Sequence, residues 1–124
     1  MWNSLRDHST LLVLLIVLLQ GCDSSSRSLA LDEEQARAAC ETFLKTWQAG
    51  ESVESLKPTV VGRDIAWDAG QRLVSFEFQP EEFNDGTNLH IPVTLVLEDG
   101  KGKSANSKVV YVVGTSPVIT VFRE

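Results

Sequence analysis

The chain has 124 residues, with 11 lysines and arginines against 17 aspartates and glutamates, which gives a net charge of −6 at pH 7. This length accommodates one small domain. The excess of carboxylates argues against nucleic-acid binding, because that affinity depends mainly on lysine and arginine contacts to phosphates. It also argues against electrostatic adhesion to anionic lipid.

A run of nine apolar residues, Leu11 to Leu19, follows a short polar start that contains Arg6 and Asp7. As a helix it would span about half of a ~30 Å hydrocarbon core, which is too short for a permanent transmembrane segment. A charged start, an apolar stretch of this length and a small residue such as Gly21 are typical of an exported and cleaved segment. We therefore predict that residues 1–21 are a signal peptide.

The residues Leu19-Gln20-Gly21-Cys22 resemble the lipobox of bacterial lipoproteins. The resemblance implies that a diacylglyceryl group is attached to the Cys22 thiol and that a peptidase cleaves between Gly21 and Cys22. It also implies acylation of the new amino terminus, and two or more acyl chains such as palmitate hold a protein stably on a membrane. The alternative is an ordinary secretory signal that leaves Cys22 as a free or disulfide-bonded thiol.

Asp23 resembles the signal that retains lipoproteins in the inner membrane of enteric bacteria. The resemblance thus implies an envelope protein that faces the periplasm or the exterior, with the inner membrane favoured. Residues 22–31 are mostly polar, which predicts a flexible tether after the lipidated cysteine. With Cys22 acylated, Cys40 has no cysteine partner, so residues 32–124 must be held together by a hydrophobic core.

Asp32 begins the clearest predicted element, an amphipathic helix of about four turns that ends near Gly50. Glu33-Glu34-Gln35 completes a variant of the capping box and places acidic residues in the first turn, where the helix dipole favours them. The pattern places Cys40 in the core as a small hydrophobic residue. A single apolar stripe at helical spacing follows the cap, made of Ala36, Ala39, Cys40, Phe43, Leu44 and Trp47.

From Thr59 onward the apolar period changes to two, which is typical of strands. Asp68 to Gln71 resembles a turn that joins the first two strands as a hairpin. Pro92 predicts that the third strand lies at an edge or carries a bulge. The predicted strands cover residues 64–68, 74–78, 89–97, 108–113 and 118–122, and polar segments over 80–87 and 99–107 are expected to be loops.

These elements predict the α+β class, with one N-terminal amphipathic helix packed on a curled antiparallel sheet of four or five strands. The order of elements over residues 32–124 resembles the cystatin-like and nuclear-transport-factor-2-like architecture. Members of these families bind small molecules or peptides, mediate assembly or, in some cases, carry an acid–base residue in the cone between helix and sheet. The cystatin inhibitor motif Gln-x-Val-x-Gly is absent, so the resemblance does not imply protease inhibition.

The usual motifs of catalysis and cofactor binding, G-x-S-x-G, H-E-x-x-H, G-x-G-x-x-G and a cysteine pair, do not occur. We therefore expect no cofactor, no metal and no catalytic residue. The chain is expected to be a membrane-anchored envelope lipoprotein that binds a protein or a small ligand. Its binding residues and the biological role cannot be assigned from the sequence.

Two alternatives come from other functional classes. The first is a small isomerase- or hydrolase-like enzyme that uses Asp68, Glu77 or His90 in the cone, although His90 is expected to face away from the core. The second is a structural assembly subunit. A cone filled by Phe43, Trp47 and Phe76 would favour the binding module, whereas a deep cavity around an ionisable residue would favour the enzyme.

Overall fold

The structure is a computed structural model and describes residues 30–124, of which Leu31–Glu124 form one compact unit. The predicted signal peptide, the cleavage site at Gly21, the lipidation site at Cys22 and Asp23 lie outside the described residues. Among those that are described, no helix is long and apolar enough to cross a membrane.

Helix α2 (Glu33–Gln48) has the start and the apolar face that the sequence predicts. The Asp32 carboxylate accepts a hydrogen bond of 3.0 Å from the Gln35 amide, which caps the first turn. All six residues of the predicted stripe are buried, and Cys40 and Phe43 are fully shielded from solvent. The stripe therefore forms one side of the core.

The end of α2 is a Schellman motif, in which a residue with positive φ reverses the chain. Gly50 has a φ of 77° and donates its amide hydrogen to the Trp47 carbonyl. The next amide, of Glu51, reaches back to the Thr46 carbonyl. Glycine adopts this backbone conformation without the strain that a side chain would add, which explains why the helix ends where the sequence predicts.

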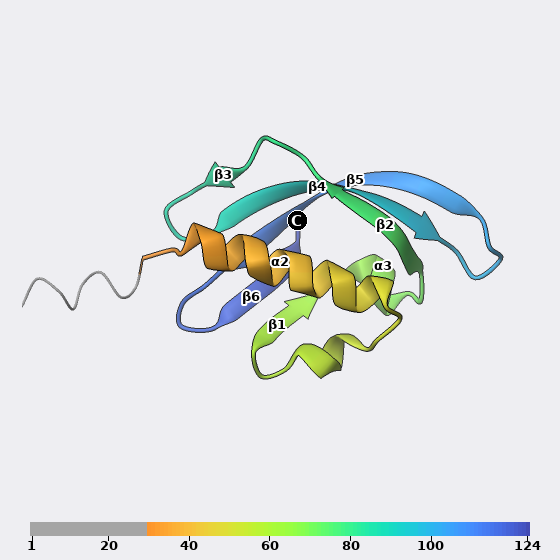
Figure 1. Cartoon of the computed structure of the whole chain (residues 1–124), viewed down its shortest axis with the longest axis horizontal. Coiled ribbons are helices and arrows are strands. Elements are labelled where there is room, and N and C mark those ends of the chain that lie inside the picture. The colour runs from red at the N-terminus through yellow and green to blue at the C-terminus, as the bar shows by residue number, and fades with distance from the viewer. Residues whose placement is uncertain (1–29) are drawn as a thin grey trace, which may run out of the picture. The chain divides into compact units, whose positions relative to one another are not determined.

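Six strands and two short helical segments follow α2. Figure 1 shows that the sheet curves around α2, which covers one of its faces. The order across the sheet is β1-β6-β5-β4-β2, and β3 pairs with β4 beyond the end of β2. The elements are the 3₁₀ helix η2 (Val53–Leu56), β1 (Val60–Arg63), α3 (Ile65–Asp68), β2 (Arg72–Phe78), β3 (Phe83–Asn84), β4 (Leu89–Glu98), β5 (Ser104–Gly114) and β6 (Ile119–Arg123).

The α+β class and the curled sheet are confirmed, but two details of the predicted architecture are wrong. The sheet has six strands and is mixed, because β1 runs parallel to β6 while the other pairs are antiparallel. The helix is the first element of the Leu31–Glu124 unit but follows more than thirty residues, so it is not at the N-terminus of the chain.

The predicted hairpin between residues 64–68 and 74–78 is also wrong. Ile65–Asp68 form the short helix α3, and the first strand precedes it. The alternation of Ile65 and Trp67 is compatible with both structures, because four residues are too few to distinguish a helical turn from a strand. Gly70 then ends α3 with a φ of 83°, within the segment that was predicted to turn.

Strand β4 carries the clearest predicted alternation, with Leu89, Ile91, Val93, Leu95 and Leu97 all buried. The edge position or bulge that Pro92 predicts is wrong on both counts. Strand β4 lies between β5 on one side and β2 and β3 on the other, and its register with β5 runs without a shift through Pro92 and Val110. Pro92 is accommodated there because it sits where β2 has ended and β3 has not begun. On that side the carbonyl of Pro92 accepts a hydrogen bond from the Gln79 amide, and proline has no N–H that would need an acceptor there.

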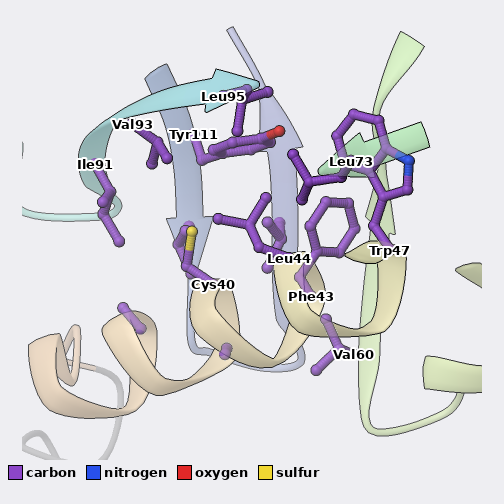
Figure 2. Close-up of a cluster of buried hydrophobic side chains, with 14 of the residues drawn as sticks. Cys40, Phe43, Leu44, Trp47, Val60, Leu73, Ile91, Val93, Leu95 and Tyr111 are labelled. Carbon is purple, nitrogen blue, oxygen red and sulfur yellow. The ribbon is translucent and has the colours of Figure 1, made fainter. Parts of the chain in front are cut away.

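Aromatic side chains fill the space between α2 and the sheet (Figure 2). Phe43 meets Tyr111 edge to face, with ring centroids 5.9 Å apart. Trp47 stacks on Trp67 of α3 with ring centroids 5.5 Å apart, and its indole N–H donates to the Gln71 carbonyl. Aromatic pairs of this kind add to the stabilisation that burial alone provides. The interior of the curved sheet is therefore packed rather than open.

Candidate functional site

The three residues proposed for a cone enzyme lie apart and outside the core. Asp68 is exposed at the end of α3 and pairs with Arg63 at 2.7 Å. Glu77 lies opposite Thr94 in the register of β2 and β4, and Thr94 alternates with buried residues of β4. Glu77 therefore lies on the outer face of the sheet, the face turned away from α2. His90 lies on that outer face too, as the sequence predicts. None of the three therefore lies in the interior between α2 and the sheet.

His90, near the start of β4, contacts the acidic loop between β3 and β4. Its Nε2 lies 2.8 Å from Asp85 Oδ2, and its ring is 5.6 Å from that of Phe83. The other Asp85 oxygen accepts the amides of Thr87 and Asn88. The hydrogen bond from the Asn88 amide is the main reason that the pKa of Asp85 is lowered to about 2, and the contact with His90 is the next. Asp85 therefore serves to fix the loop between β3 and β4.

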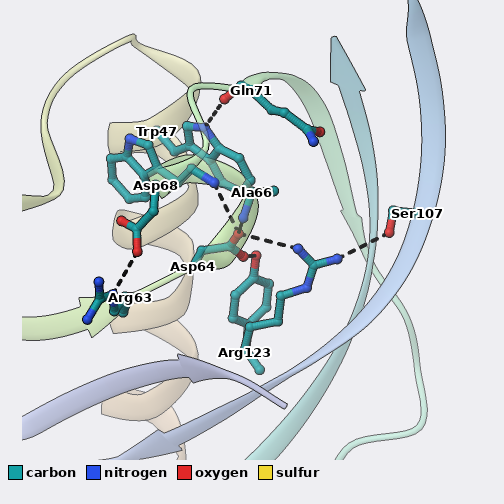
Figure 3. A network of polar contacts seen from close by, with 10 residues as sticks. Trp47, Arg63, Asp64, Ala66, Asp68, Gln71, Ser107 and Arg123 are labelled. Atoms are coloured by element: carbon teal, nitrogen blue, oxygen red, sulfur yellow. Dashed lines mark hydrogen bonds and ion pairs between the residues drawn. The ribbon is translucent and has the colours of Figure 1, made fainter. Parts of the chain in front are cut away.

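The buried carboxylate of the domain is Asp64, a residue that the sequence analysis assigned to a strand. It caps α3, because its Oδ1 accepts the amides of Ala66 at 2.7 Å and of Trp67 at 3.2 Å. Two side chains from the sheet complete its surroundings (Figure 3). The Tyr111 hydroxyl donates to Oδ2 at 2.6 Å, and Arg123 Nη1 lies 3.3 Å from Oδ1.

This arrangement satisfies Asp64 on both oxygens and pairs its charge with a guanidinium. No buried side-chain nitrogen or oxygen of the described residues lacks a hydrogen-bond partner. Burial, and to a smaller extent the hydrogen bond to Asp64, raises the pKa of Tyr111 above its usual value. Asp64 is thus a fully engaged structural carboxylate, and it is enclosed in packed side chains rather than facing an enclosed substrate cavity.

An open depression lies beside this network, where α3 meets the tip of the β4–β5 hairpin. We call it the open-end groove; its volume is about 540 Å³. The register pairs Leu97 with Ala105 and Leu95 with Ser107, so small side chains occupy the sheet where α2 no longer covers it. The groove is lined by Ile65, Ala66, Ala69, Gln71, Leu97, Asp99, Lys103, Ala105, Asn106, Ser107 and Arg123.

The open-end groove combines an apolar rim with cationic and hydrogen-bonding groups. Ile65 is 76% exposed, which is unusual for a large aliphatic side chain. Arg123 projects from β6 on the side that faces the groove and contacts Ser107 Oγ through Nη2 at 3.3 Å. Asp99 is directed toward its own turn, where one oxygen accepts the amides of Lys101 and Lys103.

Two further depressions lie around the end of β6. One, of about 620 Å³, is bordered by Pro92, Thr94 and Lys108 on the outer face of the sheet, and the second, of about 680 Å³, lies beside Arg63 and Phe122. Arg123 borders both of these depressions as well as the open-end groove. We take the open-end groove as the candidate site because it also contains Ala66 and Ser107, which contact Asp64 and Arg123.

The residues that build this site are not among the candidates predicted from the sequence. Asp64 could have been found, since an aspartate before Ile65 and a further acidic residue at Asp68 are typical of a helix start. No local pattern identifies Arg123, because its partner Asp64 is 59 positions away. Cys40, by contrast, lies in the core as the sequence predicts. Burial, with a smaller contribution from the charge of Glu82, raises the pKa of its thiol to about 12.

Within residues 30–124, no group of three or more histidine, cysteine, aspartate or glutamate side chains could hold a metal ion. Comparisons of the chain with family models, curated proteins and solved structures found no match. The lipobox and the resemblance to cystatin-like and nuclear-transport-factor-2-like proteins therefore stay predictions from the sequence.

Proposed function

We propose that this chain is an envelope lipoprotein, anchored through acyl chains on Cys22, whose Leu31–Glu124 unit is a binding module. The proposal of a binding module rests on the contrast between the packed interior and the open-end groove. Phe43 and Trp47 fill the space that a cone enzyme would need for its substrate, and Phe76 packs half-buried against the same core. The apolar and cationic groups of the groove remain accessible instead.

The membrane anchor is supported by the position of Cys22, which follows nine apolar residues and the sequence Leu-Gln-Gly. The acyl chains must supply the membrane affinity alone, because the chain has an excess of six negative charges. Asp23 favours the inner membrane, with the module on the periplasmic side.

Metabolic labelling with a radioactive fatty acid tests the anchor. Wild-type protein should incorporate label and fractionate with membranes, whereas Cys22→Ser should lose the label and either stay uncleaved or be released. Cys40→Ala is the matched control, because the core thiol of Cys40 is inaccessible and its removal should leave labelling intact. Equal label in wild type and Cys22→Ser would refute the lipoprotein proposal.

A further inference from the structure

The cationic groups of the open-end groove are not fully engaged within the described residues. Arg123 directs Nη1 to Asp64 and Nη2 to Ser107, each at 3.3 Å, longer than the usual 2.9–3.0 Å for such bonds. A guanidinium has five N–H donors, so Arg123 retains capacity for another acceptor. Its side chain is 18% exposed, and it borders the groove as well as the two depressions around the end of β6.

Lys103 adds a second positive charge at the rim. None of the ion pairs among residues 30–124 involves it. Asp99 is the one carboxylate among the lining residues, and its Oδ1 is occupied by backbone amides of the hairpin turn. The groove thus presents two cationic groups and one carboxylate, and the charge of Arg123 is already paired with the buried Asp64.

The groove also contains apolar surface. Ile65 stands exposed on α3, and Ala69 and Leu97 continue the surface toward the floor. A site with an apolar wall and a few convergent polar groups is the usual design of a small-ligand site, and a volume of about 540 Å³ falls within the common range.

We propose that the open-end groove binds a carboxylate joined to a short branched apolar group, a deepening that rests on the binding function proposed above. Arg123 and Lys103 face the carboxylate, while Ile65 and Leu97 contact the apolar part. A carboxylate matches the planar fork of a guanidinium, which favours this anion over a neutral acceptor. The same chemistry occurs in a free acid and at the carboxyl terminus of a peptide that ends in leucine.

The groove and the point where the chain enters the Leu31–Glu124 unit lie at opposite ends of α2. The chain enters the unit at Leu31, beside the β5–β6 turn, where the Asp32 amide donates to Thr115 Oγ1. The groove lies at the other end of α2, by α3 and the hairpin tip (Figure 1).

The test uses the full chain in detergent micelles and three probes with the same branched five-carbon skeleton, 3-methylbutanoate, 3-methylbutan-1-ol and 3-methylbutylammonium. We expect the acid to shift the amide NMR signals of Ala69, Leu97 and Ser107 in a saturable way. The alcohol should bind more weakly, and the ammonium ion should not bind. Equal binding of acid and alcohol would overturn the carboxylate proposal and leave the binding module in place, whereas no shift with any probe would refute binding at this groove altogether.

Matched variants locate the contacts. Lys103→Gln should weaken binding of the acid by about two- to fivefold, as expected for one exposed ion pair, and leave binding of the alcohol unchanged. Lys101→Gln is the control, since Lys101 lies in the same turn but does not line the groove. An equal effect of both changes would mean that the acid responds only to the overall charge of the turn, and the proposed binding site would be refuted.

A comparison with peptides distinguishes the two sources of the carboxylate, a free acid and a peptide terminus. Acetyl-Ala-Ala-Leu with a free carboxyl terminus is compared with its carboxamide. Tighter binding of the free peptide than of 3-methylbutanoate would assign the groove to peptide ends, and the reverse order would assign it to small acids. If the carboxamide bound as well as the free peptide, the carboxylate would have no part in recognition and the proposal would be refuted.

Discussion

Tyr111 and Asp64 are 47 positions apart in the sequence, yet the phenol hydroxyl donates a hydrogen bond of 2.6 Å to the Asp64 carboxylate. The bond joins the middle of the sheet to the first turn of α3. Since Asp64 is 1% exposed, each donor that faces it offsets part of the cost of removing its charge from water. This contact fixes α3, which forms one wall of the open-end groove.

Tyr111→Phe removes that donor and keeps the ring in the core. We expect the free energy of unfolding to fall by about 1.5–3 kcal/mol, the usual effect of a hydrogen bond to a charged group. Urea unfolding measures the change. Ser107→Ala is the control: its bond to Arg123 is longer and only half-buried, so its loss should cost less than about 1 kcal/mol. A larger effect of Ser107→Ala would mean that the network depends on Arg123 rather than on the tyrosine.

Alkaline titration provides a second test of the same contact, because Tyr111 is the only tyrosine of the chain. Burial and the Asp64 contact raise the pKa of Tyr111 above its usual value near 10. The folded protein should therefore show no phenolate absorbance until it unfolds. Since the folded pKa is the higher one, the contribution of Tyr111 to stability should be complete below about pH 10 and decline above it. Reversible phenolate formation in folded protein near pH 10 would contradict this.

Acid titration should reveal Asp85. Its pKa is lowered to about 2, whereas an unfolded chain has a value near 3.9. Its contribution to stability is therefore complete above about pH 4 and is lost as the pH falls through about 2. We expect the amide NMR signals of Thr87 and Asn88 to titrate together at low pH, and Asp85→Asn to abolish that titration. A midpoint near 4 would mean that the loop does not hold the carboxylate.

Cys40 should react slowly with thiol reagents in the folded chain and fast in denaturant, because it is buried and its thiolate is disfavoured. The Cys22→Ser chain isolates this thiol. In the wild-type chain, acylated Cys22 should add no reactive thiol. A fast phase present in purified wild type and absent from Cys22→Ser would show that Cys22 is free, which favours the ordinary secretory signal.

The parts of the fold that the sequence predicts best are those defined by neighbours in the chain. Helix α2 follows from a cap, a stripe and a terminal glycine within Asp32 to Gly50, and β4 follows from the alternation of Leu89 to Leu97. Both signals arise because one face of a regular element is buried and the other is not. Neither requires knowledge of the partner that covers the buried face.

The parts that could not be predicted depend on distant partners. β1 is recognisable as a strand only through its parallel pairing with β6, where Val60 lies opposite Ile119. Likewise, nothing near Asp64 indicates that Tyr111 and Arg123 will surround it. The groove arises from where α2 stops relative to the β4–β5 hairpin, a relation between elements that no local pattern contains.

The packing of Phe43 against β1 supports a last prediction. A Cβ atom at Gly62 would lie 2.6 Å from Phe43 Cε2 and 2.7 Å from the Val121 carbonyl oxygen, closer than atoms tolerate. Gly62→Ala should therefore lower the free energy of unfolding by about 1–3 kcal/mol, as overpacking does. Gly100→Ala is the matched control, since its Cβ would meet no atom within 4 Å. Because the ring of Phe43 is the movable neighbour, the double variant Gly62→Ala with Phe43→Leu should lose less than the sum of the two single losses. Additive losses, measured by urea unfolding, would show that the Val121 carbonyl alone makes glycine necessary at this position.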